Sequence, residues 1–238
     1  MDLDRRERIR AALIQVVVPI LLLGIAAMWL GSSGADTALL VPFFDVQQHD
    51  FTRHGEWFYD TLLHDGGKYL IIAAAFVLVV LGVVAAIRKQ PRDKWGTLLY
   101  PAVCLLVTVA IAGEWKHLAH QGTPADLVRF GGKLPTLEVH TPRIFGLHLG
   151  SPAAHASSGF AWISLYFVAL SIGAARPWLW VLPGAVLGLA FAVTQNVRGA
   201  HVPSHNLWSI AIAWGVAAAV AAVFRRYGLL ARADIRAV

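Results

Sequence analysis

The chain alternates between polar segments and long apolar stretches, and six of these stretches are candidates for membrane-spanning helices. Their approximate bounds are residues 12–31, 69–87, 95–113, 156–173, 179–195 and 207–224. Each comes close to the ~20 apolar residues that a helix needs to cross a bilayer core of about 30 Å. None has Asp, Glu, Lys or Arg in its interior. Because lipid offers the backbone no hydrogen-bond partners, the pattern predicts helices and not strands. We therefore expect an all-α bundle of six transmembrane helices, with residues 1–238 forming one domain.

The polar segment between the first two runs also carries apolar side chains at roughly helical spacing. They are Phe51, Trp57, Phe58, Leu62 and Leu63. A helix with one apolar and one charged face lies in the plane of the membrane interface. The spacing predicts an interfacial amphipathic helix within residues 32–68, which would cap the bundle or guide a lipid headgroup.

Composition also indicates a membrane protein. Of the 238 residues, 57% are hydrophobic and only 14% are charged, whereas an ordinary soluble domain has about 25% charged residues. These values exclude a disordered chain and argue against a soluble globular domain. Cys104 is the only cysteine, so a disulfide within the chain is excluded.

The distribution of basic residues predicts the orientation. If the N-terminus is cytoplasmic, most of the 20 Lys and Arg residues lie in cytoplasmic segments, where such residues accumulate in membrane proteins. We therefore expect both termini in the cytoplasm. The formal net charge of +6 then reflects this bias and not nucleic-acid binding. All ten histidines fall in outer segments or at outer helix ends, which predicts imidazole chemistry at the outer face.

Three outer segments carry residues suited to phosphoryl transfer. The candidates are Lys116, Asp126 and Arg129 in the first segment, Ala154 and His155 in the second, and Gln195, Arg198, His201 and His205 in the third. Lys and Arg can neutralise phosphoryl oxygens, Arg in bidentate fashion. One imidazole can attack phosphorus as a nucleophile, and another can protonate the leaving oxygen.

In order and outward placement, the three segments resemble the signature of the type 2 phosphatidic acid phosphatase superfamily, which includes membrane lipid phosphatases and vanadium haloperoxidases. That signature reads Lys-x6-Arg-Pro, then Pro-Ser-Gly-His, then Ser-Arg-x5-His-x3-Asp. Lys116 and Pro124 match the first motif, Pro152 and His155 match the second, and His201 takes the nucleophile position of the third. The amino-acid sequences of the second and third segments are similar to those of a bacterial subgroup of the superfamily.

Several signature positions differ in this chain. The departures are Thr123 for the first Arg, Ala153 and Ala154 for Ser and Gly, Thr194 and Gln195 for Ser and Arg, and His205 for Asp. Arg198 lies three residues after position 195, on the same helical face, so we expect it to supply the missing guanidinium. We expect Arg129, held by a local ion pair with Asp126, to replace the first Arg.

The change at position 205 affects the nucleophile most directly. In the signature, Asp accepts the Nδ1–H bond of the nucleophilic histidine and stabilises its cation. A neutral His205 can accept that bond, whereas a protonated one cannot. We therefore expect activity to fall below about pH 6.5, the unperturbed pKa of histidine. In an alternative register, His205 is the nucleophile and Ser209 takes the Asp position.

The resemblance implies a metal-independent lipid phosphatase without a cofactor. His201 would form a phosphohistidine, His155 would protonate the leaving oxygen, and Lys116, Arg198 and Arg129 would hold the phosphate oxygens. The implied substrates are phospholipid phosphates, polyprenyl diphosphates or the phosphates of lipid A, within membrane lipids and without a nucleic-acid partner. The site would face the periplasm from a bacterial inner membrane. Transfer of the phosphoryl group to another lipid would use the same residues.

Two other functions fit parts of the pattern. A non-catalytic relative would bind lipid headgroups without turnover, as the changed signature positions allow. A membrane metalloenzyme is the second, because two imidazoles four residues apart share a helical face and have a metal-ligand spacing. The residues of that alternative are His201 and His205, with His117, His120 or His155 as further ligands.

Overall fold

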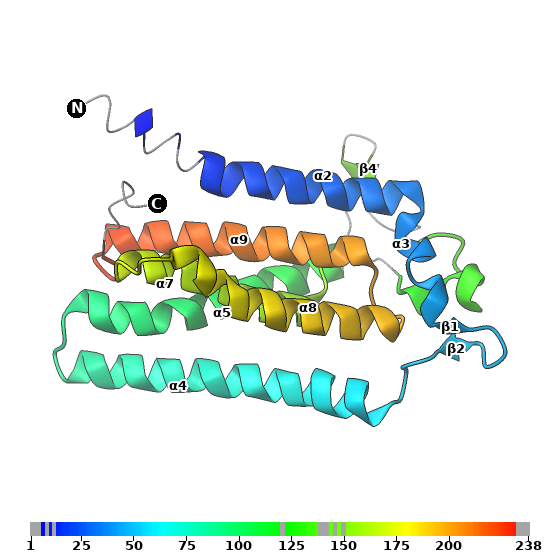
Figure 1. Ribbon diagram of the computed structural model, residues 1–238, viewed down its shortest axis with the longest axis horizontal. Coiled ribbons are helices and arrows are strands. Elements are labelled where there is room, and N and C mark those ends of the chain that lie inside the picture. Colours follow the sequence, from blue (N-terminus) through cyan, green and yellow to red (C-terminus); the bar gives the residue numbers. More distant parts are fainter. Residues whose placement is uncertain are drawn as a thin grey trace.

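The computed structural model describes residues 6–7, 10, 13–119, 122–137, 143–144, 147–148 and 151–231 and is predominantly helical. The N-terminal half forms η1 (Leu13–Val17), α2 (Val18–Ser33), α3 (Ala35–Ala38), η3 (Phe58–Gly66), α4 (Gly67–Ile87) and α5 (Arg92–Ala119). The C-terminal half forms α6 (Ala154–Phe160), η6 (Ala161–Ser164), α7 (Leu165–Ser171), η7 (Pro177–Val181), α8 (Leu182–Val197) and α9 (Pro203–Arg226). The long helices run side by side along the longest axis of the molecule (Figure 1).

Five helical segments are long and apolar enough to cross a membrane. They are Leu13–Ser33, Phe58–Ile87, Arg92–Asp126, Pro177–Val197 and Pro203–Arg226. Each coincides with one of the predicted runs. The chain is therefore a membrane protein built from helices, as the apolar pattern indicates.

The predicted run at 156–173 takes a different form. It consists of α6, η6 and α7 in succession, so a 3-10 segment interrupts the α-helix. Ser157, Ser158 and Ser164 make this segment more polar than the others, and most of it is buried inside the bundle. The six-helix prediction is thus confirmed for five helices, and the crossing by the sixth segment stays a prediction.

The first and last long helices begin and end on the same side of the bundle. The first turn of α2 and the last turn of α9 are at the same end of the molecule, on the left of Figure 1. This arrangement agrees with an expectation that both termini share one side of the membrane. That this side is the cytoplasm stays a prediction from the basic residues.

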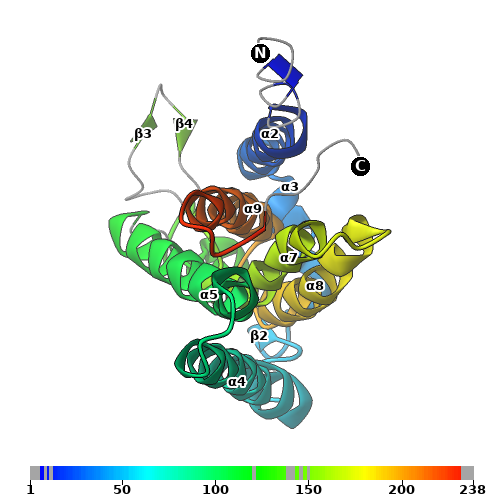
Figure 2. The same cartoon turned by 90° about the vertical axis from the view of Figure 1, so that its left-hand side faces the viewer.

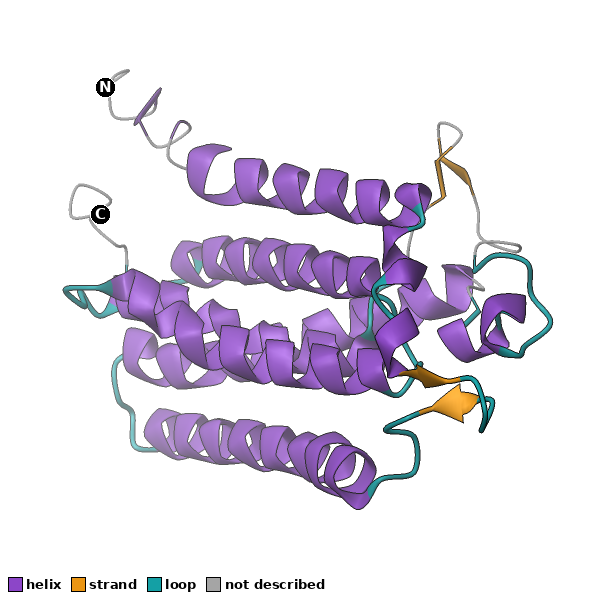
Figure 3. Ribbon diagram, turned by 45° about the vertical axis from the view of Figure 1, so that its right-hand side comes forward, coloured by secondary structure: helices purple, strands orange, loops and turns teal. Residues whose placement is uncertain are grey.

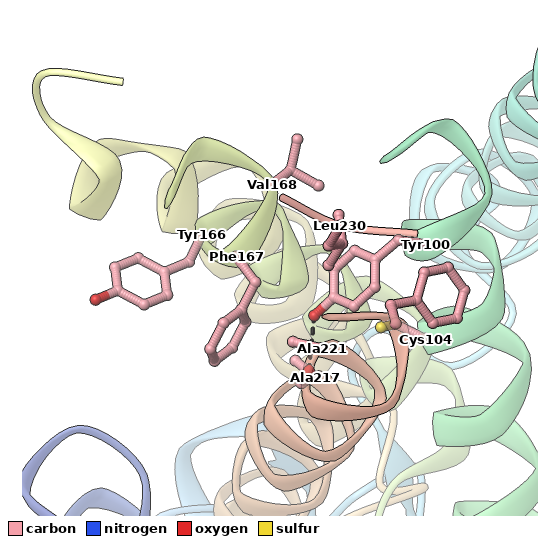
Figure 4. Close-up of a cluster of buried hydrophobic side chains, with 9 residues drawn as sticks. Tyr100, Cys104, Tyr166, Phe167, Val168, Ala217, Ala221 and Leu230 are labelled. Atoms are coloured by element: carbon pink, nitrogen blue, oxygen red, sulfur yellow. Dashed lines mark hydrogen bonds between the residues drawn. The ribbon is translucent and has the colours of Figure 1, made fainter. Parts of the chain in front are cut away.

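Helix α9 lies near the centre of the bundle. Seen along the bundle, α2, α5 and α7 surround α9, and α4 lies beyond α5 (Figure 2). Helix α2 packs mainly on α9, and α4 packs mainly on α5. A buried cluster of Tyr100, Cys104, Tyr166, Phe167, Val168, Ala217, Ala221, Phe224 and Leu230 joins α5, α7 and α9 (Figure 4). Within it, the Tyr100 hydroxyl donates a hydrogen bond to the Ala217 carbonyl at 2.7 Å.

Short elements cover the other end of the bundle (Figure 3). They are η2 (Val41–Phe43), β1 (Phe44–Asp45), β2 (Asp50–Phe51), η4 (Pro124–Asp126), η5 (Val128–Phe130), β3 (Arg143–Ile144) and β4 (Leu147–His148). β1 pairs antiparallel with β2, and β3 with β4. A cap cluster, formed by the buried side chains of Leu40, Phe51, Leu127, Phe130, Leu137 and Val202, joins the β1–β2 hairpin and the η4–η5 segment to the start of α9.

The predicted interfacial helix is only partly present. Trp57 precedes η3, and Phe58, Leu62 and Leu63 lie within it, but η3 continues directly into α4. Phe51 is in the β1–β2 hairpin and only 3% exposed, so it does not belong to an amphipathic helix. A polar turn separates it from the preceding strand, because the Asp45 carboxylate accepts the Gln47 N–H at 2.8 Å. Helical spacing alone did not reveal that turn.

Candidate active site

The three sequence segments meet at the end of the bundle covered by the cap cluster. Lys116 lies in the last turn of α5, His155 lies in the first turn of α6, and the residues of the third segment join α8 to α9. Close packing of α6 on α8 produces this arrangement. A Cβ atom added to Gly159 would lie only 2.7 Å from the Gly188 Cα atom, so both helices need glycine there. Small residues allow such close approach in membrane bundles.

A tight turn positions His201 between the last two helices. The backbone N–H groups of Ala200 and His201 both donate to the Gln195 carbonyl, at 2.9 and 3.2 Å. Gly199 has a φ of +70°, and a Cβ atom there would lie 2.2 Å from the Phe51 ring. The turn therefore requires glycine both for its backbone conformation and for its contact with the cap cluster.

His201 and His205 form the central contact of the site. Their Nδ1 atoms are 3.0 Å apart, so one imidazole donates its Nδ1–H and the other accepts it. His205 is only 2% exposed, whereas His201 is half-buried. When His201 is the donor, its Nε2 lone pair is available to attack an electrophile. This is the tautomer that a nucleophilic His201 requires.

Ser209 does not take part in that contact. Its hydroxyl accepts the Ala153 N–H at 2.9 Å and lies 2.9 Å from the His205 carbonyl. It thereby fastens the start of α6 to α9. The alternative register assigns Ser209 to orient the His205 imidazole, and these contacts do not favour it. The hydrogen bond to Ser209 also uses the backbone N–H of Ala153. Ala154, the next residue, is half-buried and is the first residue of α6.

The surroundings favour the neutral form of His201. Burial, followed by the charges of Lys116 and His155, lowers its pKa to about 3. Desolvation disfavours the imidazolium, and nearby cations repel it. Lys116 is exposed, so its ammonium is accessible from the surface while its charge acts on His201.

Arg198 is held by two acceptors. Its Nε forms an ion pair with the Asp60 carboxylate of η3, and its Nη1 donates to the Gln195 Oε1 atom at 3.3 Å. The contact with Gln195 places the guanidinium beside the signature position that lacks its Arg. The sequence pattern predicts that Arg198 serves this position, and the Arg198 and Gln195 side chains are in contact.

His155 lies between two rings. The His64 ring centroid is 4.5 Å from that of His155, and the Phe191 centroid is 4.3 Å away on α8. The buried Nε2 atom of His155 has no hydrogen-bond partner among the described residues. His64 in turn contacts the Asp65 carboxylate through Nδ1 at 3.1 Å. A proton-transfer group with an unused ring nitrogen is thus present in the site.

Asp126 and Arg129 make their hydrogen bonds to threonines and not to the histidines or Arg198. The Asp126 carboxylate accepts the Thr123 N–H and hydroxyl at 2.7 and 2.8 Å, which closes the 3-10 turn η4. Arg129 donates to the Thr37 hydroxyl at 3.1 Å. The predicted Asp126–Arg129 ion pair is therefore wrong: the donors of Thr123 are nearer in the turn and occupy the carboxylate.

Sequence reasoning missed three acidic or imidazole residues that precede α4. Asp60 and His64 contact Arg198 and His155, as described above. Asp36, only 4% exposed, accepts the Ser204 N–H at 2.8 Å and so caps the start of α9. The spacing of Asp60 and His64, one turn apart before an apolar run, was a signal, but nothing in the sequence indicated their partners.

The described residues contain no group of three or more His, Cys, Asp or Glu side chains arranged to hold a metal ion. His120, one of the ligands considered for a metal site, lies outside the described residues. His117 is exposed near the end of α5.

The comparisons with known proteins agree with the geometry. The sequence model of the PAP2 superfamily matches residues 97–228. This segment covers more than half of the chain, runs from α5 to the end of α9 and includes all three sequence segments. No curated protein and no solved structure matches the chain. The chain belongs to the PAP2 superfamily.

Proposed function

We propose that this protein is a membrane lipid phosphatase that uses His201 as its nucleophile. Membership of the superfamily indicates a phosphatase acting on lipid-like substrates. The observation that carries the specific assignment is the 3.0 Å contact between the Nδ1 atoms of His201 and His205. It leaves Nε2 of the less buried ring available, as an attacking histidine requires.

The reaction divides into two steps. In the first, His201 Nε2 attacks phosphorus, the bond to the lipid oxygen breaks, and His155, which enters the step as the imidazolium, donates a proton to that oxygen. In the second, His155 accepts a proton from water, which attacks the phosphohistidine and releases phosphate. Lys116 and Arg198 neutralise the phosphoryl oxygens during both steps. Arg129 lies on the same end of the molecule and is a further candidate for binding the headgroup.

An apolar groove supports a lipid as the substrate. It has a volume of about 440 Å³ and runs between α4 and α5, where Ile72, Ala75, Phe76 and Leu105 are among its lining residues. Lys68 and Ser158 belong to the same lining, and the Ser158 hydroxyl donates to the His155 carbonyl at 2.7 Å. The groove thus begins one helical turn from His155. We assign it to one hydrocarbon chain of the substrate, with Lys68 facing the anionic headgroup.

Phospholipid phosphates, polyprenyl diphosphates and the phosphates of lipid A all combine such a chain with a phosphate group. We place the site on the outer side of a bacterial inner membrane, because basic residues are concentrated at the opposite end of the bundle. Neither this orientation nor the substrate affects the residues assigned to the reaction.

The decisive experiment measures phosphate release by the purified protein from a panel of these three lipid classes. A phosphohistidine that is labile to acid and stable to base should accumulate when the reaction is quenched rapidly. His201→Ala should abolish both turnover and the intermediate. Binding of the lipids without any turnover would instead identify a non-catalytic relative, and dependence of turnover on a bound metal would identify a metalloenzyme.

A further inference from the structure

Asp60 lies outside the segment that matches the superfamily, yet it contacts a residue of the proposed site. Its Oδ2 atom accepts the Gly55 N–H at 2.6 Å, which fixes the carboxylate to the backbone before η3. Its Oδ1 atom forms the ion pair with Arg198 Nε. The Arg198 and Asp60 side chains are only 16% and 26% exposed. The pair is therefore sheltered from most of the solvent screening that weakens surface ion pairs.

The approach of η3 to the site depends on glycine. A Cβ atom added to Gly67, at the start of α4, would lie 2.4 Å from the Phe191 ring of α8. Phe191 also contacts His155. The junction between η3 and α4 therefore sits directly against α8, and this contact brings Asp60 within reach of Arg198 at the end of that helix.

The guanidinium of Arg198 is planar and carries its donors in a fixed geometry. Asp60 holds Nε, and Gln195 holds Nη1 at 3.3 Å. Among the described residues, Nη2 has no protein acceptor, so it is the nitrogen left to meet a phosphoryl oxygen. Two acceptors fix the plane and rotation of the group, whereas Gln195 alone would leave it free to rotate about the one contact.

We propose that Asp60 is a positioning residue that aligns Arg198 for phosphoryl transfer. The inference rests on the proposed phosphatase function. In the signature, the guanidinium comes from position 195, whereas here it comes from a residue at the C-terminal end of α8. A side chain displaced in this way needs a separate anchor, and η3 supplies one from the N-terminal half of the chain.

The charge of Asp60 gives this role a kinetic signature. A carboxylate near the phosphate opposes binding of the anionic substrate, so its removal does not weaken ground-state binding. Alignment matters most in the transition state, where misplacement of a group lowers kcat. Asp60→Asn should therefore lower kcat about tenfold while KM stays within about twofold of the wild-type value or decreases. A purely structural role would not separate the two constants in this way.

A double-mutant cycle tests whether Asp60 acts through Arg198. We expect Arg198→Ala to lower kcat/KM, and Asp60→Asn to have less than about a twofold further effect in that background. Glu56→Gln is the matched control, because Glu56 lies two residues before η3 and, among the described residues, its side chain pairs only with exposed Arg53. It should leave both constants unchanged. If Asp60→Asn does not fold, Asp60→Glu provides the same cycle with the charge retained and its position shifted.

Three results would overturn the inference, and they are distinguishable. An equal loss of kcat on changing Asp60 in both backgrounds would show that Asp60 does not act through Arg198. An unchanged kcat in folded Asp60→Asn would show that no anchor is needed. A wild-type protein that hydrolyses none of the lipid phosphates would refute the proposed function together with this inference, whereas the first two results would leave that function intact.

Discussion

His201 and His205 share a single hydrogen between Nδ1 atoms that are 3.0 Å apart. This contact makes the roles of the two rings unequal, because only the half-buried His201 can turn Nε2 toward a substrate while His205 stays enclosed. His201→Ala should therefore abolish turnover, whereas His205→Ala should lower kcat by about 10² while leaving measurable activity. Phosphate release by the two folded variants is the measurement. The opposite order of effects would transfer the nucleophile to His205.

The surroundings of His201 change the expected pH dependence. Burial, then the charges of Lys116 and His155, lower the pKa of His201 to about 3. A base with a lowered pKa stays neutral to lower pH, and the shared hydrogen makes His201 and His205 titrate as a pair. Protonation of this pair should therefore lower kcat/KM only below about pH 5, and not near the unperturbed histidine pKa of about 6.5. We call this fall the acid limb.

Comparison with His205→Asp separates this limb from ionisation of the substrate. A carboxylate beside His201 favours its imidazolium and raises its pKa. The acid limb should therefore move to higher pH in that variant, although both proteins act on the same substrate. Identical profiles for the two proteins would show that the limb does not report the histidine pair.

The bundle could be predicted from the sequence to a large extent, because the bilayer requires long apolar runs that are visible without alignment. Five runs became helices of spanning length. Hydropathy did not predict the break within 154–171, where the side chains of Ser157 and Ser164 are buried among neighbouring helices.

The site was predictable where it is local in sequence. His201 and His205 are one turn apart, and Arg198 and Gln195 are also close along the chain, so helical spacing predicts that each pair can meet. Asp60 comes from more than a hundred residues earlier, and no spacing rule relates it to Arg198. Asp126 shows the opposite failure, since a nearby hydroxyl and N–H of Thr123 displaced the expected arginine partner.

The groove between α4 and α5 predicts a dependence on the lipid chain. Ala75 lines the groove, whereas Val77 on the same helix is 53% exposed and does not line it. Ala75→Trp should lower kcat/KM about tenfold for a long-chain lipid phosphate, because the indole occupies the space of the chain. The value for a short, water-soluble phosphate ester should stay the same. Val77→Trp, the matched control, should change neither value.

Equal losses on the long and short substrates would indicate that Ala75→Trp disturbs the site itself. Unchanged activity on both would place the chain elsewhere. A lipid with a photoreactive group in its chain gives a second measurement without turnover, because it should label α4 and α5 in the wild type and much less in Ala75→Trp.

Asp36 links α3 to the start of α9, because its Oδ1 atom accepts the Ser204 N–H at 2.8 Å and α9 has no capping side chain of its own. Burial raises the pKa of Asp36 above 3.8, despite the opposing hydrogen bond from Ser204. An acid with a raised pKa stabilises the fold most when protonated, so this contribution is lost as pH rises above 3.8.

Asp36→Asn keeps the acceptor without the charge. Its Tm should equal that of the wild type near pH 4 and exceed it near pH 8, whereas Asp36→Ala should lose about 1 kcal/mol relative to the wild type near pH 4 and less near pH 8. Thermal unfolding in detergent measures all three proteins, and a wild-type Tm that rises with pH relative to Asp36→Asn would contradict the assigned role of the buried carboxylate.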